Sequence, residues 1–243
     1  VPPTLCDPAG AGTVADGDPD EALRRVADAE IGERRCRSRG WLDHAATLTD
    51  WLTAFVTQSF HLTLPDVGTQ RELVLADLVA PRPEMEFWCG VRDADLPALD
   101  AVAVQYCQPD KPRPRITRGR FNGLLRGFID LAFEHDGRYY VADYKSNWLG
   151  AHDDAYHTGA LAQAVLAHRY DLQALIYLFA LHRLLKARLG ERYDYDRHVG
   201  GALVFFMRGN HAVSQGLHIE RPPFEAIAKL EAIFNNGEKG GAA

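Results

Sequence analysis

Two aspartates in the middle of the chain interrupt apolar segments. Asp130 lies within GFIDLAF, and Asp143 lies within YYVADYK, thirteen residues later. Burying a carboxylate is costly unless a partner offsets its charge. Two converging carboxylates favour a divalent cation, and hard oxygen ligands with open positions suit Mg²⁺. Such an ion polarises a phosphoryl oxygen and activates water as a nucleophile, so the pair predicts metal-assisted hydrolysis.

A lysine accompanies the second aspartate. Lys145 follows Asp143 by two residues, so the two side chains of a strand point to the same face. A lysine in this place can orient or deprotonate the attacking water and can offset charge on the transition state. Asp-x-Lys alone is a weak motif, and an ion pair at the end of a strand explains it equally well. The surrounding elements must decide between the two interpretations.

The pattern around these residues predicts a β-hairpin. Apolar, aromatic-rich runs flank the residues 135–137, His-Asp-Gly. Asp-Gly between such runs is a strong hairpin signal. We therefore expect two antiparallel strands that bring Asp130 and Asp143 to the same end of a sheet.

Hydrophobic periodicity predicts the other elements. Helices are expected at Asp20–Ile31, in ATLTDWLTAFVTQ, at Leu96–Tyr106, at about Thr158–Leu189 and from Pro222 or Pro223 onward. Strands are expected around Met85–Cys89 and at Gly201–Arg208, and the stretch between residues 59 and 81 is expected to be irregular. This order implies an α/β fold with a mixed central sheet flanked by helices.

Composition sets broad limits. The 243 residues are 47% hydrophobic, which suits a globular protein with a sizeable core. No apolar run approaches the roughly 20 residues of a membrane span, so we expect a cytoplasmic location and no membrane contact. The cysteines lie far apart and are expected to be reduced; they are Cys6, Cys36, Cys89 and Cys107.

The net charge of −6 is unusual for a protein that binds DNA, because phosphate binding depends on Lys and Arg. Either the basic residues cluster on one face, or other domains or subunits hold most of the nucleic acid. The basic, proline-rich segment KPRPRITRGR is the best local candidate for phosphate contact, and a solvated loop explains it equally well. The chain contains no Walker motif, so any ATP-driven motor lies outside it.

Beyond these patterns, the run GFIDLAFEHDGRYYVADYKSNWLG, followed by AHRYDLQALIYLFALHR, resembles the nuclease domains of RecB-type helicase–nucleases. These domains belong to the PD-(D/E)XK nucleases, which have the restriction-endonuclease-like fold. The resemblance is dense from about Glu84 to Arg208. It implies that residues 1–40 form an N-terminal arm or linker-like segment and that residues 41–243 form the nuclease domain.

The resemblance implies a role for each residue of the motif. Asp130 and Asp143 would be metal ligands, together with the backbone carbonyl of Tyr144. Lys145 would be the catalytic lysine. Glu84 in PEMEF matches an acidic residue before the first core strand, although a solvent-facing strand residue is the alternative.

The resemblance also covers the helix that follows the hairpin. Gln173 and Tyr177 match a Gln-xxx-Tyr pair that lines the active site, and their spacing places them on one helical face. Residues at the edge of the core are the alternative interpretation. His168 and His182 fall on the same predicted helix and are expected to be packing or surface residues.

One expected ligand is missing from the pattern. The family has a metal-ligating histidine on a helix upstream of the segment around Trp51, and residues 1–18 contain no histidine. His44 and His61 lie in the wrong context to replace it. We therefore expect weak metal binding. We also expect that one carboxylate shows a raised pKa or moves toward Lys145, because two uncompensated carboxylates repel each other.

The sequence thus leads to a functional hypothesis. The leading function is a Mg²⁺-dependent DNA nuclease domain, for which Mn²⁺ or Ca²⁺ substitutes in binding, acting on single strands delivered by a helicase. By resemblance its partners are DNA, RecC and RecD subunits, and the RecA recombinase. The alternative is a non-catalytic nuclease-like module that binds partners or channels DNA. A stand-alone restriction or repair nuclease is disfavoured by the acidic charge.

Overall fold

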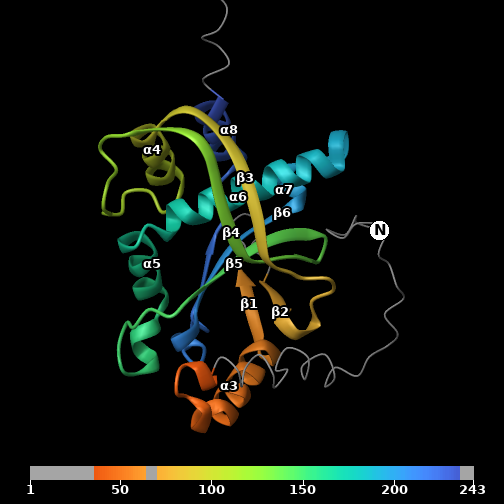
Figure 1. Cartoon of the computed structure of the whole chain (residues 1–243), viewed down its shortest axis with the longest axis vertical. Helices are drawn as coiled ribbons and strands as arrows, with labels where there is room; N and C mark the ends of the chain where they lie inside the picture. Colours follow the sequence, from red (N-terminus) through yellow and green to blue (C-terminus); the bar gives the residue numbers. More distant parts are fainter. Residues whose placement is uncertain (1–35, 64–69, 236–243) are drawn as a thin grey trace, which may run out of the picture.

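The computed structural model describes residues 36–63 and 70–235 (Figure 1). Its strands are β1 Ser59–Thr63, β2 Gln70–Val74, β3 Arg82–Asp95, β4 Arg120–His135, β5 Arg138–Lys145, β6 Val199–Phe206 and β7 Leu217–Glu220. Its α-helices are α3 Ala45–Thr57, α4 Leu96–Tyr106, α5 Thr158–Ala167, α6 Tyr170–Leu189, α7 Tyr195–His198 and α8 Phe224–Asn235. Short 3₁₀ turns lie at Leu42–His44, Leu75–Asp77, Asp153–Tyr156, Gly190–Arg192 and Met207–Gly209.

Five of these strands form the central sheet, in the order β3-β4-β5-β6-β7. The pairs are antiparallel except β5 with β6, which run parallel and are connected through α5, α6 and α7. A parallel pair needs a long crossover connection, and the predicted helical segment supplies it. The predicted α/β fold, with a mixed sheet flanked by helices, is confirmed.

Strand β5 shows why the hairpin is so apolar. Tyr139 and Val141 face the core formed with α4, α6 and α8, whereas Tyr140 and Ala142 face a second core formed with α3, β1 and β2. All four side chains are buried, so this strand is covered on both faces. A carboxylate in such a strand is therefore held in place by dense packing on either side.

Several predicted elements are confirmed. Helix α4 has the expected bounds, α3 occupies the segment around Trp51, and the β4–β5 hairpin turns at Asp136 and Gly137. Both turn residues have positive φ, 50° and 77°, as an Asp-Gly turn requires. Cys36, Cys89 and Cys107 are buried free thiols.

The prediction of irregular structure between residues 59 and 81 is wrong for residues 59–63 and 70–74. Strands β1 and β2 pair there antiparallel, with Phe60 opposite Leu73. Phe60 and Leu62 are fully buried under α3, whereas His61 and Thr63 are exposed. Buried and exposed side chains do alternate along β1, but the pattern spans only five residues. So short a pattern does not identify a strand next to a segment that contains proline. Strand β7 also was not predicted.

The single helix predicted at Thr158–Leu189 is wrong, because α5 and α6 are separate helices. Arg169 between them adopts a left-handed conformation, with φ 59° and ψ 33°. This conformation is unfavourable for a residue with a Cβ atom. Its side chain bonds to Asp171 at 3.1 Å and to the carbonyl of Pro114 at 2.8 Å, and these contacts offset the strain.

Four other expectations have different outcomes. Strand β6 begins two residues before the predicted Gly201, and α8 begins at Phe224, just after the predicted prolines. The predicted helix Asp20–Ile31 lies outside the described residues. The division of the chain at residue 40 stays a prediction.

Candidate active site

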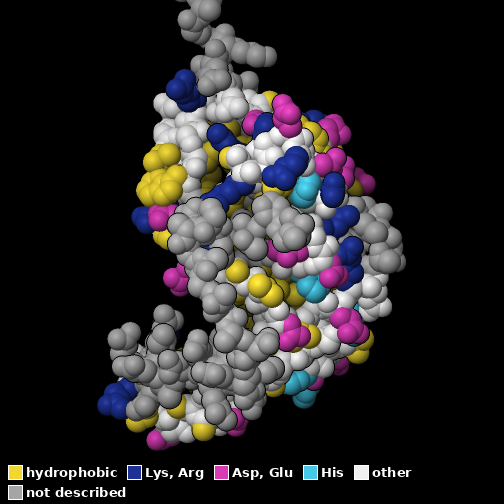
Figure 2. Space-filling model, turned by 90° about the vertical axis from the view of Figure 1, so that its right-hand side faces the viewer, with side chains coloured by type: hydrophobic (Ala, Val, Ile, Leu, Met, Phe, Trp, Pro, Cys, Tyr) yellow, Lys and Arg dark blue, Asp and Glu magenta, His cyan; other side chains and the backbone are white. Residues whose placement is uncertain are grey.

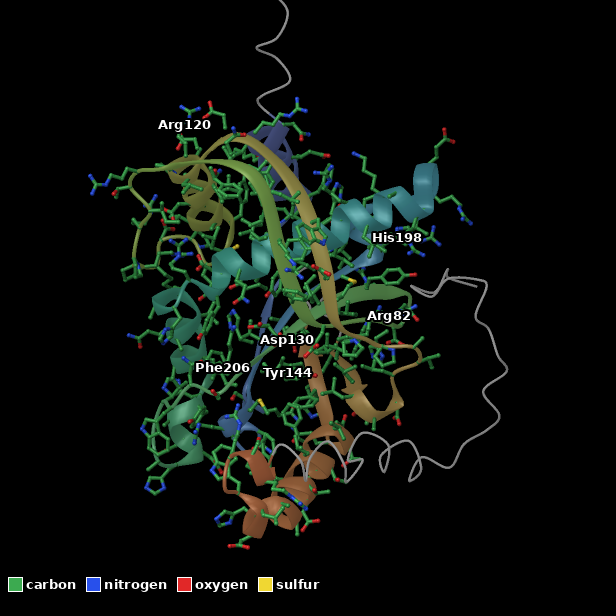
Figure 3. All side chains as sticks on the ribbon, in the orientation of Figure 1. Arg82, Arg120, Asp130, Tyr144, His198 and Phe206 are labelled. Atoms are coloured by element: carbon green, nitrogen blue, oxygen red, sulfur yellow. The ribbon has the colours of Figure 1, made fainter. Side chains whose placement is uncertain are left out.

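The two aspartates lie where the ladder between β4 and β5 ends. Leu131 pairs with Ala142, and the next opposed position belongs to Asp130 and Asp143. Instead of a further backbone pair, the Asp130 carboxylate accepts a hydrogen bond from the backbone N–H of Tyr144 at 2.9 Å. Figure 3 shows Asp130 and Tyr144 beside each other near the centre of the molecule. The end of the ladder thus brings the two carboxylates together.

Glu84 lies in the same row on the neighbouring strand. Pro83 pairs with Leu131 and Met85 with Ile129, so the register position of Glu84 faces Asp130. Its backbone is left-handed, with φ 50°, and its side chain is exposed. Strain of this kind in a residue other than glycine is often found at functional sites. Glu84 is therefore placed beside the aspartates, but its side chain makes no contact with them that defines a role.

Lys145 and the helix α6 complete the cluster. Lys145 forms an ion pair with Asp143, and its ammonium donates to the amide oxygen of Gln173 at 3.0 Å. The amide nitrogen of Gln173 donates to Asp143 at 3.2 Å and to the Tyr177 hydroxyl at 2.8 Å. Tyr177 in turn donates to the carbonyl of Phe128 at 2.7 Å. One glutamine thus fixes both members of the ion pair.

Burial dominates the electrostatics of this cluster. The Asp143 side chain is 10% exposed, and burial raises the pKa of its carboxyl above the usual value. The pairing with Lys145 lowers that pKa, and the charge of Asp130 raises it. Burial, together with the charge of Asp130, also raises the pKa of Tyr144 to about 12. Asp143 therefore has a raised pKa and contacts Lys145, and burial contributes more to the raised pKa than the neighbouring carboxylate does.

This shift predicts how stability depends on pH. Because the folded-state pKa of Asp143 lies above its unfolded value, ionised Asp143 disfavours the folded state, and stability falls as pH rises from the unfolded pKa through the folded one. With chelator present, Asp143→Asn should therefore raise the melting temperature at about pH 8. The difference in melting temperature between the variant and the unmodified chain should narrow as the pH falls toward 3.8, the ordinary pKa of an aspartate carboxyl. A lower melting temperature for the variant at the higher pH would show that pairing with Lys145 outweighs the cost of burial.

The basic loop has a different role from the one considered for it. The Arg113 side chain lies fully buried and pairs with Asp171 at 2.8 Å, and Arg115 pairs with the buried Asp100. Arg120 pairs with Asp93 at 2.6 Å. The idea that these arginines contact phosphate is wrong for Arg113, because its guanidinium has no exposed surface. Arginines and acids are also interspersed on the face shown in Figure 2.

Two histidines in the helical segment after the hairpin, His168 and His182, have ring partners, and Tyr170 beside His168 also lies 4.2 Å below the Lys145 ammonium. His182 is buried and bonds to the Tyr193 hydroxyl at 2.8 Å, and His168 stacks on Tyr170 at 5.4 Å. Within residues 36–63 and 70–235, no group of three or more His, Cys, Asp or Glu side chains is arranged to hold a metal. Residues 1–18, where the family pattern places its upstream histidine, lie outside these ranges. No helix among the described residues combines the length and apolar character of a membrane span.

The fold and this cluster define a class of protein. A model of the PD-(D/E)XK nuclease superfamily matches residues 15–236. The chain belongs to this superfamily.

Individual relatives narrow the comparison. The chain is 37% identical over 193 residues to the RecBCD enzyme subunit RecB of Escherichia coli (strain K12), a match that covers 77% of this chain and 16% of that protein. The chain is 35% identical to RecB of Haemophilus influenzae, and this match covers 77% of the chain and 15% of that protein. The chain is 32% identical to RecB of Mycolicibacterium smegmatis, and this match covers 72% of the chain and 18% of that protein. The chain is thus a RecB-like nuclease domain, and the matched segment covers less than a fifth of the length of these relatives.

Proposed function

We propose that this domain is a Mg²⁺-dependent deoxyribonuclease that hydrolyses phosphodiester bonds in single strands, by exonucleolytic and endonucleolytic cleavage. The observation that carries the proposal is the opposed position of Asp130 and Asp143 at the end of the β4–β5 ladder, with Lys145 paired to one of them. A strand buried on both faces gains nothing structural from two carboxylates and an ammonium group. Metal-assisted hydrolysis of a phosphodiester has a use for all three groups.

The donor set fits a divalent cation. Asp143 and Asp130 supply hard oxygen ligands. Their negative charges repel each other, and a bound cation would offset this repulsion. By resemblance the carbonyl of Tyr144 is a further ligand. Mg²⁺ would supply Lewis-acid activation of the phosphoryl group, with Mn²⁺ or Ca²⁺ able to replace it in binding.

The protein residues have separate tasks in this scheme. Lys145 orients or deprotonates the attacking water and offsets charge that develops on the phosphoryl oxygens. Gln173 holds the side chains of Lys145 and Asp143 in position through hydrogen bonds. Tyr177 links Gln173 to the backbone of β4. Glu84, in the row with Asp130, is assigned as an acidic residue that borders the site.

The relatives' names suggest the wider context. RecB of these organisms is a subunit of the RecBCD enzyme. We therefore propose that the domain receives strands from a helicase motor elsewhere in its complex, with RecC and RecD subunits as partners and RecA as a further contact. The process would be double-strand break repair and recombination in the cytoplasm.

The test uses the 243-residue chain with linear and circular single-stranded DNA. We expect cleavage of both in Mg²⁺ and none in EDTA, because the carboxylates act through the cation. Cleavage of the linear strand alone would restrict the activity to ends. DNA binding without cleavage would favour the non-catalytic module that channels DNA.

Gln173 gives a second test of the site. Gln173→Leu removes the bonds to Lys145, Asp143 and Tyr177 while it keeps the side-chain volume. Loss of a residue that orients metal ligands typically reduces activity or metal affinity by about 10- to 100-fold. We expect a loss of this size, partly restored by higher Mg²⁺. The control is Gln105→Leu on α4, whose side chain contacts Lys229 and should leave cleavage unchanged.

A further inference from the structure

A basic groove runs beside the cluster, between strand β3 and the second half of helix α6. It has a volume of about 610 Å³ and is lined by Arg82, Arg183 and Arg188, among other residues. Its acidic lining residue is Glu86, whose carboxylate is already paired with Arg126. In a chain with a net charge of −6, this groove is locally basic. The groove therefore complements an anionic ligand.

Aromatic side chains extend this groove onto the outer face of β3 and β4. Trp88 is 55% exposed and Phe128 is 47% exposed, although both belong to the central sheet. The guanidinium of Arg126 lies 4.9 Å from the centroid of each ring. Arg126 is held in place by its ion pair with Glu86. Two rings and a fixed arginine thus form a platform whose flat faces can stack with planar groups.

The groove adjoins the candidate active site. Tyr177 donates to the carbonyl of Phe128, and its ring contacts Phe87 of the groove at 5.9 Å between centroids. Along α6 the residues 173, 177, 180, 184 and 188 recur at intervals of three or four, so they share one helical face. That face runs from Gln173 in the site to Arg188 in the groove, about 22 Å at 1.5 Å per residue.

We propose that this groove and the Trp88–Phe128 platform bind the single-stranded DNA segment that adjoins the scissile phosphate. Arg183 and Arg188 bind its phosphates, and Trp88 and Phe128 stack with its bases. Only a single strand offers unstacked base faces to such rings, so the platform favours single strands over duplex. The inference rests on the proposed nuclease function, because it takes the cluster as the place of cleavage.

The experiment measures binding apart from cleavage. A labelled oligothymidylate of about 16 nucleotides is titrated with the full chain in EDTA, with fluorescence anisotropy as the readout. Trp88→Ala should weaken binding roughly 5- to 150-fold through the loss of stacking, and Trp88→Phe should restore most of it. Trp88 fluorescence, obtained by subtracting the signal of Trp88→Phe, should be quenched on binding. Folding is checked by circular dichroism and is expected to be unaffected, because the ring is half exposed.

The arginines are tested through salt dependence. The double variant Arg183→Ala/Arg188→Ala should lower the slope of log affinity against log salt by about 1.4, because each phosphate contact in a single strand contributes about 0.7. Trp88→Ala should leave this slope unchanged. The control is Arg39→Ala/Arg197→Ala, which makes the same charge change outside the groove.

The outcomes separate the two proposals. Unchanged binding and slope in the groove variants, with cleavage by the unmodified chain intact, would overturn the inference and leave the nuclease function standing. Groove-dependent binding without cleavage in Mg²⁺ would support the inference and reject the function. Equal losses in the double variant and in its control would show a general charge effect, and this too would overturn the inference.

Discussion

Replacing Asp143 with alanine should reduce Mg²⁺-dependent cleavage of single-stranded DNA by about 10³-fold or more. Removing one preorganised group that stabilises charge in the transition state already costs roughly 10²–10³ in rate. Asp143 additionally holds Lys145 and Gln173, so its loss affects the proposed cation site and the lysine together. The measurement is the initial rate of nucleotide release from a labelled strand.

The same variant should remain folded. Alanine removes a carboxylate whose ionised form is disfavoured by burial, and it opens only a small space. The control is Asp154→Ala, which removes an exposed aspartate from the turn before α5 and should cut at the normal rate. Near-normal cleavage by a folded Asp143→Ala variant would show that the site lies elsewhere.

The hairpin could be predicted from the sequence because its signals are local. Asp136-Gly137 specifies the turn, and the apolar residues around it fit a strand covered on both faces. Once the turn is known, pairing Leu131 with Ala142 follows, and with it the opposed position of Asp130 and Asp143. The spacing of the proposed site is therefore encoded in one continuous segment.

The features that could not be predicted depend on distant contacts. The break between α5 and α6 falls at Arg169, where the chain has neither glycine nor proline. The left-handed conformation of Arg169 is compensated by contacts with Asp171 and also with Pro114 and Asp100, which lie 55 and 69 residues earlier in the sequence. Arg113 looked like a solvated cation for the same reason, because its buried partner Asp171 lies 58 residues away. No local pattern distinguishes such arginines from surface arginines.

The strain at Glu84 shows a similar limit. Alternation across PEMEF predicted a strand, and Met85 and Phe87 do face the core while Glu86 and Trp88 are exposed. The positive φ of Glu84 occurs where the strand lies beside Asp130, and no sequence signal marks it. The sequence can therefore propose Glu84 as a residue near the site, but its conformation is a property of the assembled sheet.

The buried ion pairs of Asp171 with Arg113 and Arg169, at the start of α6, should contribute strongly to the free energy of unfolding. Asp171 is fully buried and accepts from Arg113 at 2.8 Å and from Arg169 at 3.1 Å. Asp171→Ala leaves the buried guanidinium of Arg113 without its carboxylate partner. Removing one partner of a buried pair typically costs about 3–5 kcal/mol. For a chain of this size, that loss lowers the melting temperature by roughly 6–20 °C.

The control for this variant is the exposed pair between Arg120 and Asp93, in which both side chains are 63% exposed. Arg120→Ala should reduce stability by at most about 1 kcal/mol, because water already solvates both charges. Differential scanning calorimetry in chelator measures both variants without a contribution from bound metal. If Asp171→Ala lost no more stability than Arg120→Ala, burial of Arg113 would not be what holds the loop against α6. The loop KPRPRITRGR would then again be a candidate for contact with phosphate, since its arginines would be free to leave their carboxylates for DNA.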